Sequence, residues 1–204
     1  VSVIIPTYNR AGLIKETIES VLTQGLCDIE ILVIDDGSTD NTRSVIDSIA
    51  DPSIKYFYQE NAGAAAARNH GMEKAEGAYV AFLDSDDLWP NDYLEVMYNA
   101  LAKNSEYEAA YSAITVVKPD GTKAPSYKMS TAHSGIITTQ LFDSGFIWPS
   151  ACLIKADVLG DLRFDEQLVN AEDSDFFLRL STSARFFFVD SVEALHRISP
   201  DSLG

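Results

Sequence analysis

The sequence predicts an α/β fold with a mostly parallel, Rossmann-like sheet covered by helices on both faces, and two observations lead to that prediction. Short apolar runs typical of buried strands alternate with segments of helical periodicity through the first hundred residues. Clusters of Asp, Asn and Gly separate these runs from those segments, as expected of connecting loops. Strands that alternate with helices of about 10–15 residues usually pair in parallel, and the helices then cover both faces of the sheet.

Four strand–helix pairs are expected in this first half. Asn9 is expected to cap the first helix, whose apolar residues Ile14, Ile18 and Val21 recur at helical spacing. The second helix follows an Asp-Gly-Ser loop, the third is rich in alanine, and the fourth follows Pro90. The strands are expected at residues 1–5, 30–35, 54–58 and 78–83, and the Ala-rich helix at residues 62–75.

The second half has a looser pattern, which predicts a smaller lobe added to the same sheet. The start without Met and the end at Gly204 suggest that natural sequence is missing at one or both ends. The expected elements are a strand at 107–117, a hairpin turn at 118–122, a short helix near 139–143, a strand at 151–155 and a helix from Glu172.

The composition narrows the class of protein. The chain has 204 residues, 46% hydrophobic and 23% charged, which is typical of a globular domain with a buried core. Its net charge of −16 argues against a nucleic-acid partner, because DNA and RNA binding requires a basic surface. Two cysteines are too few for a disulfide framework and favour a reducing compartment. No apolar run reaches the roughly 20 residues that span a bilayer.

Three carboxylates follow the fourth expected strand. The apolar run that begins at Tyr79 leads directly into Asp84, Asp86 and Asp87. Asp84 and Asp86 are two positions apart, so they project to the same side of an extended chain, where their charges repel. A divalent cation such as Mg²⁺ or Mn²⁺ would offset that repulsion, since hard oxygen ligands suit both ions. The alternative is an Asp-rich turn whose carboxylates are in water.

Polar residues end three of the expected strands. Ligands of parallel α/β sheets bind at the carboxyl ends of the strands, which places Thr7–Asn9, Asp35–Asp36 and residues 84–87 on one rim. Asp36 is either a turn residue or an acceptor for a ligand N–H, such as that of a nucleobase. Arg68, on the Ala-rich helix, either contacts a ligand phosphate or carboxylate or forms an ordinary Arg–Asp salt bridge.

A further acidic pair, Glu172 and Asp173, opens the last expected helix. Acidic residues are common in a first helical turn because they interact favourably with the helix macrodipole. The functional alternative is a general base at the cleft. A helix N-terminus lowers the pKa of a carboxyl, whereas desolvation by the neighbouring Phe176 and Phe177 raises it, and both outcomes stay open.

Other ligand motifs are absent or incomplete. A Ca²⁺ loop that starts at Asp84 would need an oxygen ligand where Leu88 stands. Neither Gly-x-x-x-x-Gly-Lys-Ser/Thr nor Gly-x-Gly-x-x-Gly follows the first strand. The three histidines lack metal-ligand spacing. Two aromatic residues beside polar loops, Tyr8 and Trp148, either pack in the core or stack on a sugar or base.

Five segments together carry a resemblance to a known family. In their order and residue types the chain resembles the family 2 glycosyltransferases. The match is close over the first hundred residues, moderate over 145–182 and unusable over 105–144. The segments are residues 1–9, 34–40, 63–69, 82–87 and 164–166; the pair Glu76 and Gly77 precedes the fourth segment, and Glu172 and Asp173 follow the last.

The resemblance implies a GT-A fold, an inverting transfer from a nucleotide-sugar donor, most commonly a UDP-sugar, and a divalent ion, Mn²⁺ or Mg²⁺. It implies that residues 1–104 are the nucleotide-sugar-binding half and residues 105–204 the acceptor-side half of one domain. By matching positions, Asp86 is the implied metal ligand and Asp173 the implied general base. The implied donor-binding residues are then Pro6, Tyr8 and Asp36 at the nucleoside and Asp84 near the ribose or metal waters. Arg68 joins this set through its possible contact with a ligand phosphate or carboxylate.

The family also suggests partners and a location. Its members build cell-surface polysaccharides on saccharide or lipid-linked saccharide acceptors, which implies peripheral association with the cytoplasmic face of the plasma membrane. Ser199 stands where many members have a His that holds metal and diphosphate, and His196 lies three positions earlier. The Gln-x-x-Arg-Trp signature of processive synthases is missing, which favours single-sugar addition. A non-catalytic nucleotide-sugar-binding module is the alternative, and a nucleotidyltransferase would need a Gly-rich loop with Arg and Lys after the first strand.

Overall fold

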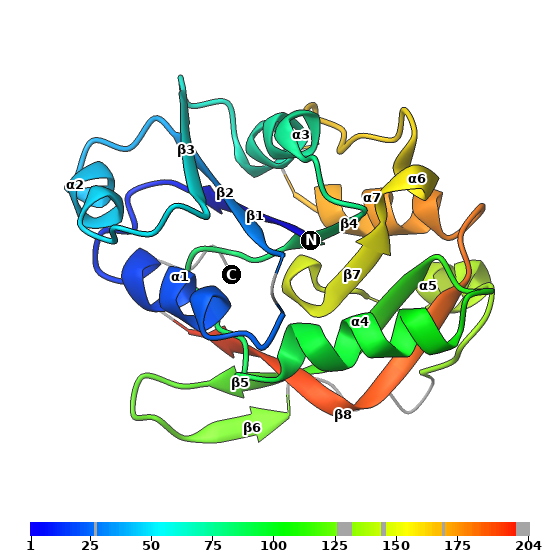
Figure 1. Ribbon diagram of the computed structural model, residues 1–204. Coiled ribbons are helices and arrows are strands. Elements are labelled where there is room, and N and C mark those ends of the chain that lie inside the picture. The colour runs from blue at the N-terminus through cyan, green and yellow to red at the C-terminus, as the bar shows by residue number, and fades with distance from the viewer. Residues whose placement is uncertain (27, 126–131, 144–145, 169, 199–204) are drawn as a thin grey trace.

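The computed structural model describes residues 1–26, 28–125, 132–143, 146–168 and 170–198. Within these residues eight strands form one mixed sheet in the order β3-β2-β1-β4-β7-β5-β6, with β8 also paired to β5 (Figure 1). The strands are β1 (Ser2–Thr7), β2 (Glu30–Asp36), β3 (Ile54–Gln59), β4 (Tyr79–Phe82), β5 (Ala109–Val117), β6 (Lys123–Pro125), β7 (Cys152–Lys155) and β8 (Phe186–Arg197).

Helices cover both faces of this sheet, as the sequence predicts. The buried side chains of α1 and α4 share one core with Val3 and Ile5 of β1, whereas those of α3 and α7 share the other core with Ile4. Figure 1 shows α3 above β1 and β2 and α1 below them. The helices are α1 (Ile14–Leu22), α2 (Thr42–Asp47), α3 (Ala64–Lys74), α4 (Tyr93–Lys103), α5 (Thr138–Asp143), α6 (Ala156–Leu159) and α7 (Glu172–Leu180), with a 3₁₀ turn at Pro149–Ala151.

The first half of the chain forms the parallel part of the sheet. β1 lies between β2 and β4 and is parallel to both, and β3 is parallel to β2. The second half adds antiparallel pairs, because β7 runs against both β4 and β5 and the β5–β6 hairpin folds back on itself. The predicted hairpin turn is present, with Gly121 at a φ of +79° that favours glycine. The predicted short helix corresponds to α5.

Asn9 does not cap the first helix, so that prediction is wrong. Helix α1 begins at Ile14 and has no side-chain cap. Asn9 instead adopts a left-handed φ of +51°, and its Oδ1 accepts the backbone N–H of Thr39 at 2.8 Å. Its own N–H donates to Ser38 Oγ at 2.9 Å. Asn and Asp adopt this conformation more readily than other side chains, and here Asn9 ties the loop after β1 to the loop after β2.

Strand β8 was not expected from the sequence. Its first four residues, Phe186–Val189, have the aromatic and β-branched side chains that favour a strand, but the polar residues Asp190, Ser191 and Glu193 interrupt the apolar pattern. It pairs in parallel with β5, with a register shift between Ser112 and Ala113. Leu195 of β8 also forms an antiparallel bridge with Leu88, so the strand ends beside the loop that follows β4.

Close packing fixes α3 on the sheet. A Cβ added to Gly71 would lie 2.3 Å from Cγ2 of Ile4, a separation that no real Cβ shows. Ala65 and Ala67 are also buried in the core with Ile4. The small residues of α3 therefore serve helix–sheet packing, which brings Arg68 against the strand ends.

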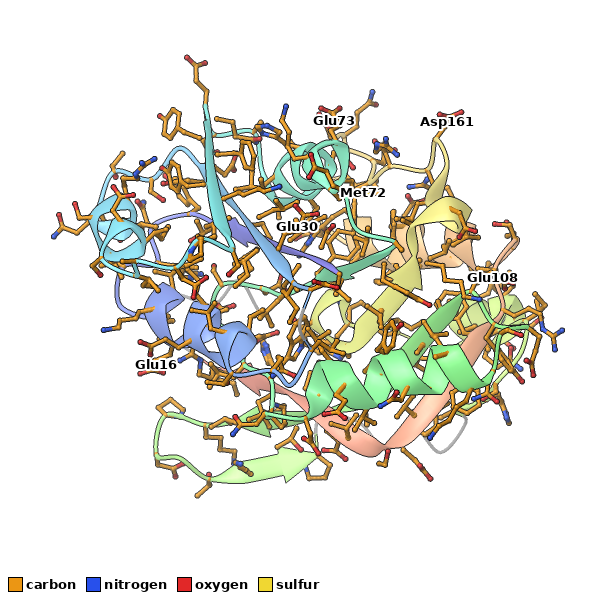
Figure 2. All side chains as sticks on the ribbon, in the orientation of Figure 1. Glu16, Glu30, Met72, Glu73, Glu108 and Asp161 are labelled. Carbon is orange, nitrogen blue, oxygen red and sulfur yellow. The ribbon has the colours of Figure 1, made fainter. Side chains whose placement is uncertain are left out.

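The surface is acidic. Figure 2 shows Glu16, Glu73 and Asp161 at separate places on the outside of the molecule, in keeping with the net charge of −16. In the residues that the structure describes, no helix is long and apolar enough to cross a bilayer.

Candidate functional site

The alternation of side chains along β1 and β2 determines which residues face α3. Ile4 and Leu32 lie in the core beneath α3, whereas Val3 and Val33 lie in the opposite core. Because successive strand residues point to opposite faces, the even-numbered Pro6 is directed to the α3 side of the rim. Asp36 is directed there too, as its hydrogen bonds confirm.

Asp36 holds the loop that leads into α3. Its Oδ1 accepts Gln59 Nε2 at 2.8 Å and the N–H of Ala62 at 2.9 Å, while its Oδ2 accepts the N–H of Gly63 at 2.8 Å. Each carboxylate oxygen offers two acceptor positions, so Oδ2 can accept one more donor. The loop role is therefore present, and the role at a nucleobase stays a prediction.

Tyr8 is the most exposed aromatic residue of the predicted set. It lies between β1 and α1 with 46% of its surface in water, so its ring is not packed in the core. A planar apolar ring exposed beside Pro6 and Asp36 suits stacking on a sugar or base. Stacking on a ligand stays a prediction.

Asp84 and Asp86 lie in the loop after β4, at the same rim. Asp84 Oδ1 accepts a hydrogen bond from an Arg68 terminal nitrogen at 2.8 Å. Asp86 Oδ2 lies 3.6 Å from Arg10 Nε, and the Asp86 carbonyl accepts Arg197 Nε at 2.5 Å. Burial raises the pKa of the Asp86 carboxyl, and the charge of Asp84 raises it further, while Arg10 opposes both. The local repulsion that the sequence predicts is present.

Asp87 serves the loop itself. Its side chain is completely buried; Oδ2 accepts the Ser150 hydroxyl at 2.6 Å and Oδ1 lies 2.8 Å from His196 Nδ1. Burial raises the pKa of Asp87, and His196 opposes that rise. Trp148 packs on the His196 ring, with 4.8 Å between the ring centroids. Ser199, which the sequence sets beside His196, lies outside the described residues.

The residues at this loop fit a divalent ion that is held by few protein ligands. Within the described ranges no group of three or more His, Cys, Asp or Glu side chains is placed to enclose a metal. Mg²⁺ and similar ions are commonly held by one or two carboxylates together with substrate phosphates, rather than by a protein cage. Asp86, with Asp84 two positions away, has the oxygen donors for such a site, and Arg10 lies 3.6 Å from the Asp86 carboxylate.

Arg68 is buried between two acids from different parts of the chain. One terminal nitrogen donates to Glu172 Oε1 at 3.0 Å and the other to Asp84 Oδ1 at 2.8 Å. The salt-bridge alternative for Arg68 is therefore observed. A direct contact with a donor stays a prediction.

Asp173 lies in the first turn of α7, with its Oδ1 accepting the N–H of Ser174 at 2.7 Å. Burial raises the pKa of the Asp173 carboxyl; Glu172 and Asp84 raise it further, while Arg68 and the Ser174 N–H lower it. Desolvation therefore outweighs the helix N-terminus, which was the question that the sequence left open. A carboxyl with a raised pKa is a stronger base once ionised.

Sequence reasoning missed the side chains that support these acids. Their partners are 63 to 111 positions away, and no local spacing marks such pairs. The supporting side chains that were missed are Arg10 beside Asp86, Ser150 and His196 on Asp87, Glu172 on Arg68, and Arg197 on the Asp86 carbonyl.

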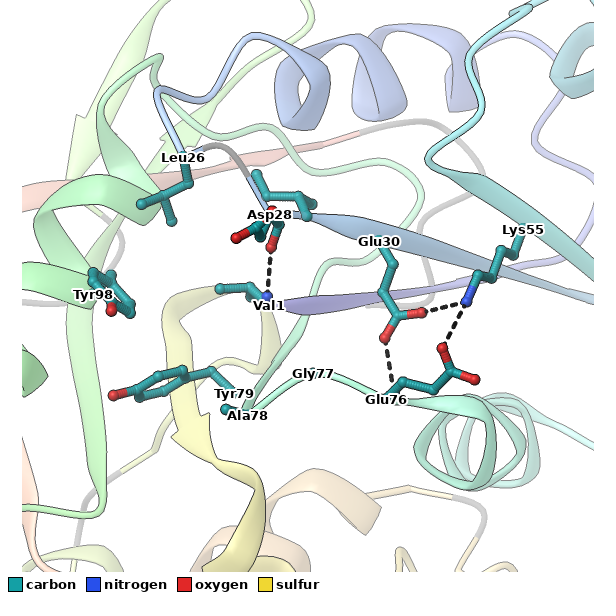
Figure 3. Close-up of a pocket in the computed structure, with 11 residues that line it drawn as sticks. Val1, Leu26, Asp28, Glu30, Lys55, Glu76, Gly77, Ala78, Tyr79 and Tyr98 are labelled. Carbon is teal, nitrogen blue, oxygen red and sulfur yellow. Dashed lines mark hydrogen bonds and ion pairs between the residues drawn. The ribbon is translucent and has the colours of Figure 1, made fainter.

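A separate pocket of about 680 Å³ lies where β1 and β4 begin, and none of the predicted site residues line it. Its charged groups are largely paired within the pocket: Lys55 lies between Glu30 and Glu76, at 2.8 and 3.2 Å, and the Val1 amino group donates to the Asp28 carbonyl (Figure 3). The strand ends that carry the predicted acids are at the opposite edge of the sheet. We therefore place the candidate site at the rim and not in this pocket.

Comparison with known proteins agrees with the fold and the motifs. The family model described as Glycosyl transferase family 2 matches residues 2–163. An uncharacterized glycosyltransferase of Rickettsia felis is 35% identical over 98% of this chain, and the chondroitin synthase of Pasteurella multocida is 33% identical over 94%. The chain spans 33% and 20% of the lengths of these two relatives.

The solved structure of S. aureus TarS 1–349 in complex with UDP shares the fold. It superposes with a TM-score of 0.80 at 25% identity, and the match covers 98% of this chain and 60% of that one. The predicted GT-A architecture is thereby confirmed, with a mixed sheet flanked by helices. The family model covers β1 to α6 and includes both the Asp84–Asp87 loop and Arg68. This chain therefore belongs to glycosyltransferase family 2.

Proposed function

We propose that this chain is the catalytic domain of an inverting, metal-dependent glycosyltransferase. It would transfer a single sugar from a UDP-sugar to an acceptor hydroxyl in cell-surface polysaccharide synthesis, at the cytoplasmic face of the plasma membrane. One observation carries the proposal: the Arg68 guanidinium joins Asp84, on the rim of the parallel strands, to Glu172, the neighbour of Asp173. A candidate metal–diphosphate site and a candidate base are thus linked through one side chain.

The donor half follows from the rim residues. Pro6, Tyr8 and Asp36 would hold the nucleoside, with the Asp36 Oδ2 lone pair accepting an N–H of the base. Asp86, with Asp84 near the ribose or the metal waters, would hold Mn²⁺ or Mg²⁺. Such an ion supplies Lewis-acid stabilisation of the charge that develops on the departing diphosphate. The UDP complex of TarS and the polysaccharide named for the Pasteurella relative support the donor and product classes.

Asp173 supplies the acceptor half of the chemistry. Its carboxylate would take the proton of the acceptor hydroxyl as that oxygen bonds to the anomeric carbon from the face opposite the leaving group. The bond between the anomeric carbon and the diphosphate oxygen breaks in the same step, and the diphosphate leaves with the bonding pair. The raised pKa of Asp173 suits a group that must accept a proton.

The test combines binding and turnover. A thermal-shift screen of nucleotide sugars with and without Mn²⁺ should identify a donor by its rise in Tm, since a ligand stabilises the fold that binds it. With that donor, Asp173→Asn should abolish transfer and donor hydrolysis while UDP binding survives. Asp175→Asn, which changes an acid in the same helical turn, is the matched control. Unchanged transfer by Asp173→Asn would exclude it as the base, and donor binding without any turnover would favour the non-catalytic module.

A further inference from the structure

Arg68 is more deeply buried than its two partners. Its side chain is 6% exposed, against 28% for Asp84 and 18% for Glu172. Its Nε has no hydrogen-bond partner among the described residues, so one donor of the guanidinium is left unsatisfied. Burying a charge with an unsatisfied donor costs free energy that a well-packed apolar side chain would avoid. The free energy of folding therefore does not explain why Arg68 is buried between Asp84 and Glu172.

A second contact of α3 reaches the same distant segment. The Asn69 side chain accepts the N–H of Phe164 at 2.8 Å and donates to the Phe164 carbonyl at 2.9 Å. It also donates to Glu166 Oε1 at 2.8 Å. Phe164 in turn stacks on Phe176 of α7, with 3.9 Å between ring centroids and 4° between ring planes. Arg68 thus binds Glu172, the first residue of α7, and the next residue, Asn69, binds the segment that precedes α7 in the chain.

We infer that Arg68 and Glu172 form a clamp that positions the Asp173 carboxylate relative to the Asp84–Asp86 loop. The inference rests on the proposed function and adds positioning residues to it. Glu172 and Asp173 are adjacent in one helical turn, so fixing the Glu172 carboxylate fixes the rotation and depth of that turn. Arg68 takes its own position from α3, which is packed on β1 through Gly71. The base is thereby set against the donor site by a rigid helix and not by a loop.

If Arg68 and Glu172 form a clamp, substitutions of Glu172 should lower kcat and leave the affinity for UDP unchanged. A misplaced base slows the chemical step, and a shift of about 1 Å can cost about 100-fold in rate. Glu172→Ala removes the acceptor for Arg68, so kcat for UDP release should fall about 10- to 100-fold. Glu172→Gln keeps an oxygen that accepts from Arg68, and its kcat should lie between those of Glu172→Ala and the wild type. The Kd of UDP with Mn²⁺ should stay within about twofold in both.

The pH profile tests the same geometry independently. The charged groups that face Asp173 are Glu172 on its own helix, Arg68 on α3 and Asp84 after β4. Both Glu172 variants lose one negative charge beside Asp173, so the acid limb of the kcat profile should move to lower pH in both by a similar amount. Position and charge are thereby separated: kcat follows the acceptor oxygen, and the acid limb follows the charge.

Asp175 supplies the matched control. It lies in the same first turn and pairs with Arg179 at 2.6 Å, away from Arg68. Asp175→Ala and Asp175→Asn make the same change of charge at the helix N-terminus, and kcat should stay within about twofold of the wild type. UDP release would be measured with UDP-N-acetylglucosamine, UDP-glucose and UDP-galactose in Mn²⁺, beside urea unfolding of each variant.

Two results would overturn the clamp. Equal kcat in Glu172→Ala and Asp175→Ala would show that the acceptor for Arg68 does not affect the base. A parallel loss of UDP affinity and folding free energy in Glu172→Ala, with an unmoved acid limb, would show a merely structural pair. No UDP release by the wild type from any of these donors would instead overturn the proposed function, and the clamp with it.

Discussion

His196 Nδ1 lies 2.8 Å from Oδ1 of Asp87, although 109 positions separate the two residues in sequence. Asp87 is completely buried in the loop that carries the candidate metal ligand, and His196 lies near the end of β8. Hydrogen bonding to Asp87 raises the pKa of His196, and burial opposes that rise. The contact joins the second half of the chain to the rim of the parallel strands.

Removing His196 should destabilise the fold. His196→Ala leaves the Asp87 carboxylate with only the Ser150 hydroxyl among its described side-chain partners, and it removes the ring that packs on Trp148. Breaking one partner of a buried charged pair costs about 3 kcal/mol. Urea unfolding measures this loss. His70→Ala is the control and should cost about 1 kcal/mol, because the hydrogen-bond partner of half-buried His70 among the described residues is the neutral Gln59 amide. Equal losses in the two variants would contradict the role given to the pair.

The ionised Asp173 carboxylate should lower the free energy of unfolding at neutral pH. Its folded-state pKa is raised, so the folded protein binds a proton more tightly than the unfolded chain does. The free energy of unfolding therefore falls as the pH rises from the ordinary value of 3.8 through the raised pKa. Asp173→Asn should be more stable than the wild type at pH 7, and the difference should vanish below pH 3.8. Denaturant unfolding at both pH values checks the sign.

The same shift predicts the activity profile. The base works only when ionised, so kcat should rise with pH through an apparent pKa that lies above the ordinary Asp value of about 3.9. A rate that is flat down to pH 4 would show that Asp173 does not limit the reaction.

Asp86 should matter for UDP binding only when metal is present. Asp86→Ala should weaken UDP binding in Mn²⁺ about 10-fold or more, because the ion loses its protein ligand. In a chelator the same variant should bind UDP at least as tightly as the wild type, since a negative charge that repels the diphosphate is gone. Calorimetry in both buffers measures the two affinities. Asp47→Asn, which removes an acid from an exposed i,i+4 pair with Arg43, is the control and should behave as wild type in both. An unchanged Mn²⁺-dependent affinity in Asp86→Ala would remove it from the metal site.

Gly71 should not tolerate a side chain. Gly71→Ala places a Cβ 2.3 Å from Cγ2 of Ile4, and such overpacking costs about 1–3 kcal/mol. The better helix propensity of Ala returns about 1 kcal/mol, so a net loss of stability is expected. Gly12→Ala is the control, since nothing lies within 4 Å of the added atom. Unfolding free energies of the two variants, beside kcat, also show how far α3 packing sets the position of Arg68.

The rim of the parallel strands was predictable because local patterns determine it. Apolar runs identify the strands, parallel strands end at one edge, and the period of two directs alternate residues to the same face. These rules place Thr7–Asn9, Asp35–Asp36 and residues 84–87 on one rim of the sheet. The helix-capping rule failed at Asn9, whose side chain accepts a hydrogen bond from the loop after β2 and caps no helix.

The sequence by itself determined the α/β class, the rim of the first half and, through its motifs, the family. Only the tertiary structure decided that β8 reaches the Asp87 loop, that Arg68 bridges Asp84 and Glu172, and that burial outweighs the helix N-terminus at Asp173. The physical reason is range. Strand and helix periodicity depends on neighbouring residues, whereas ion pairs and desolvation depend on which distant segments the fold packs together.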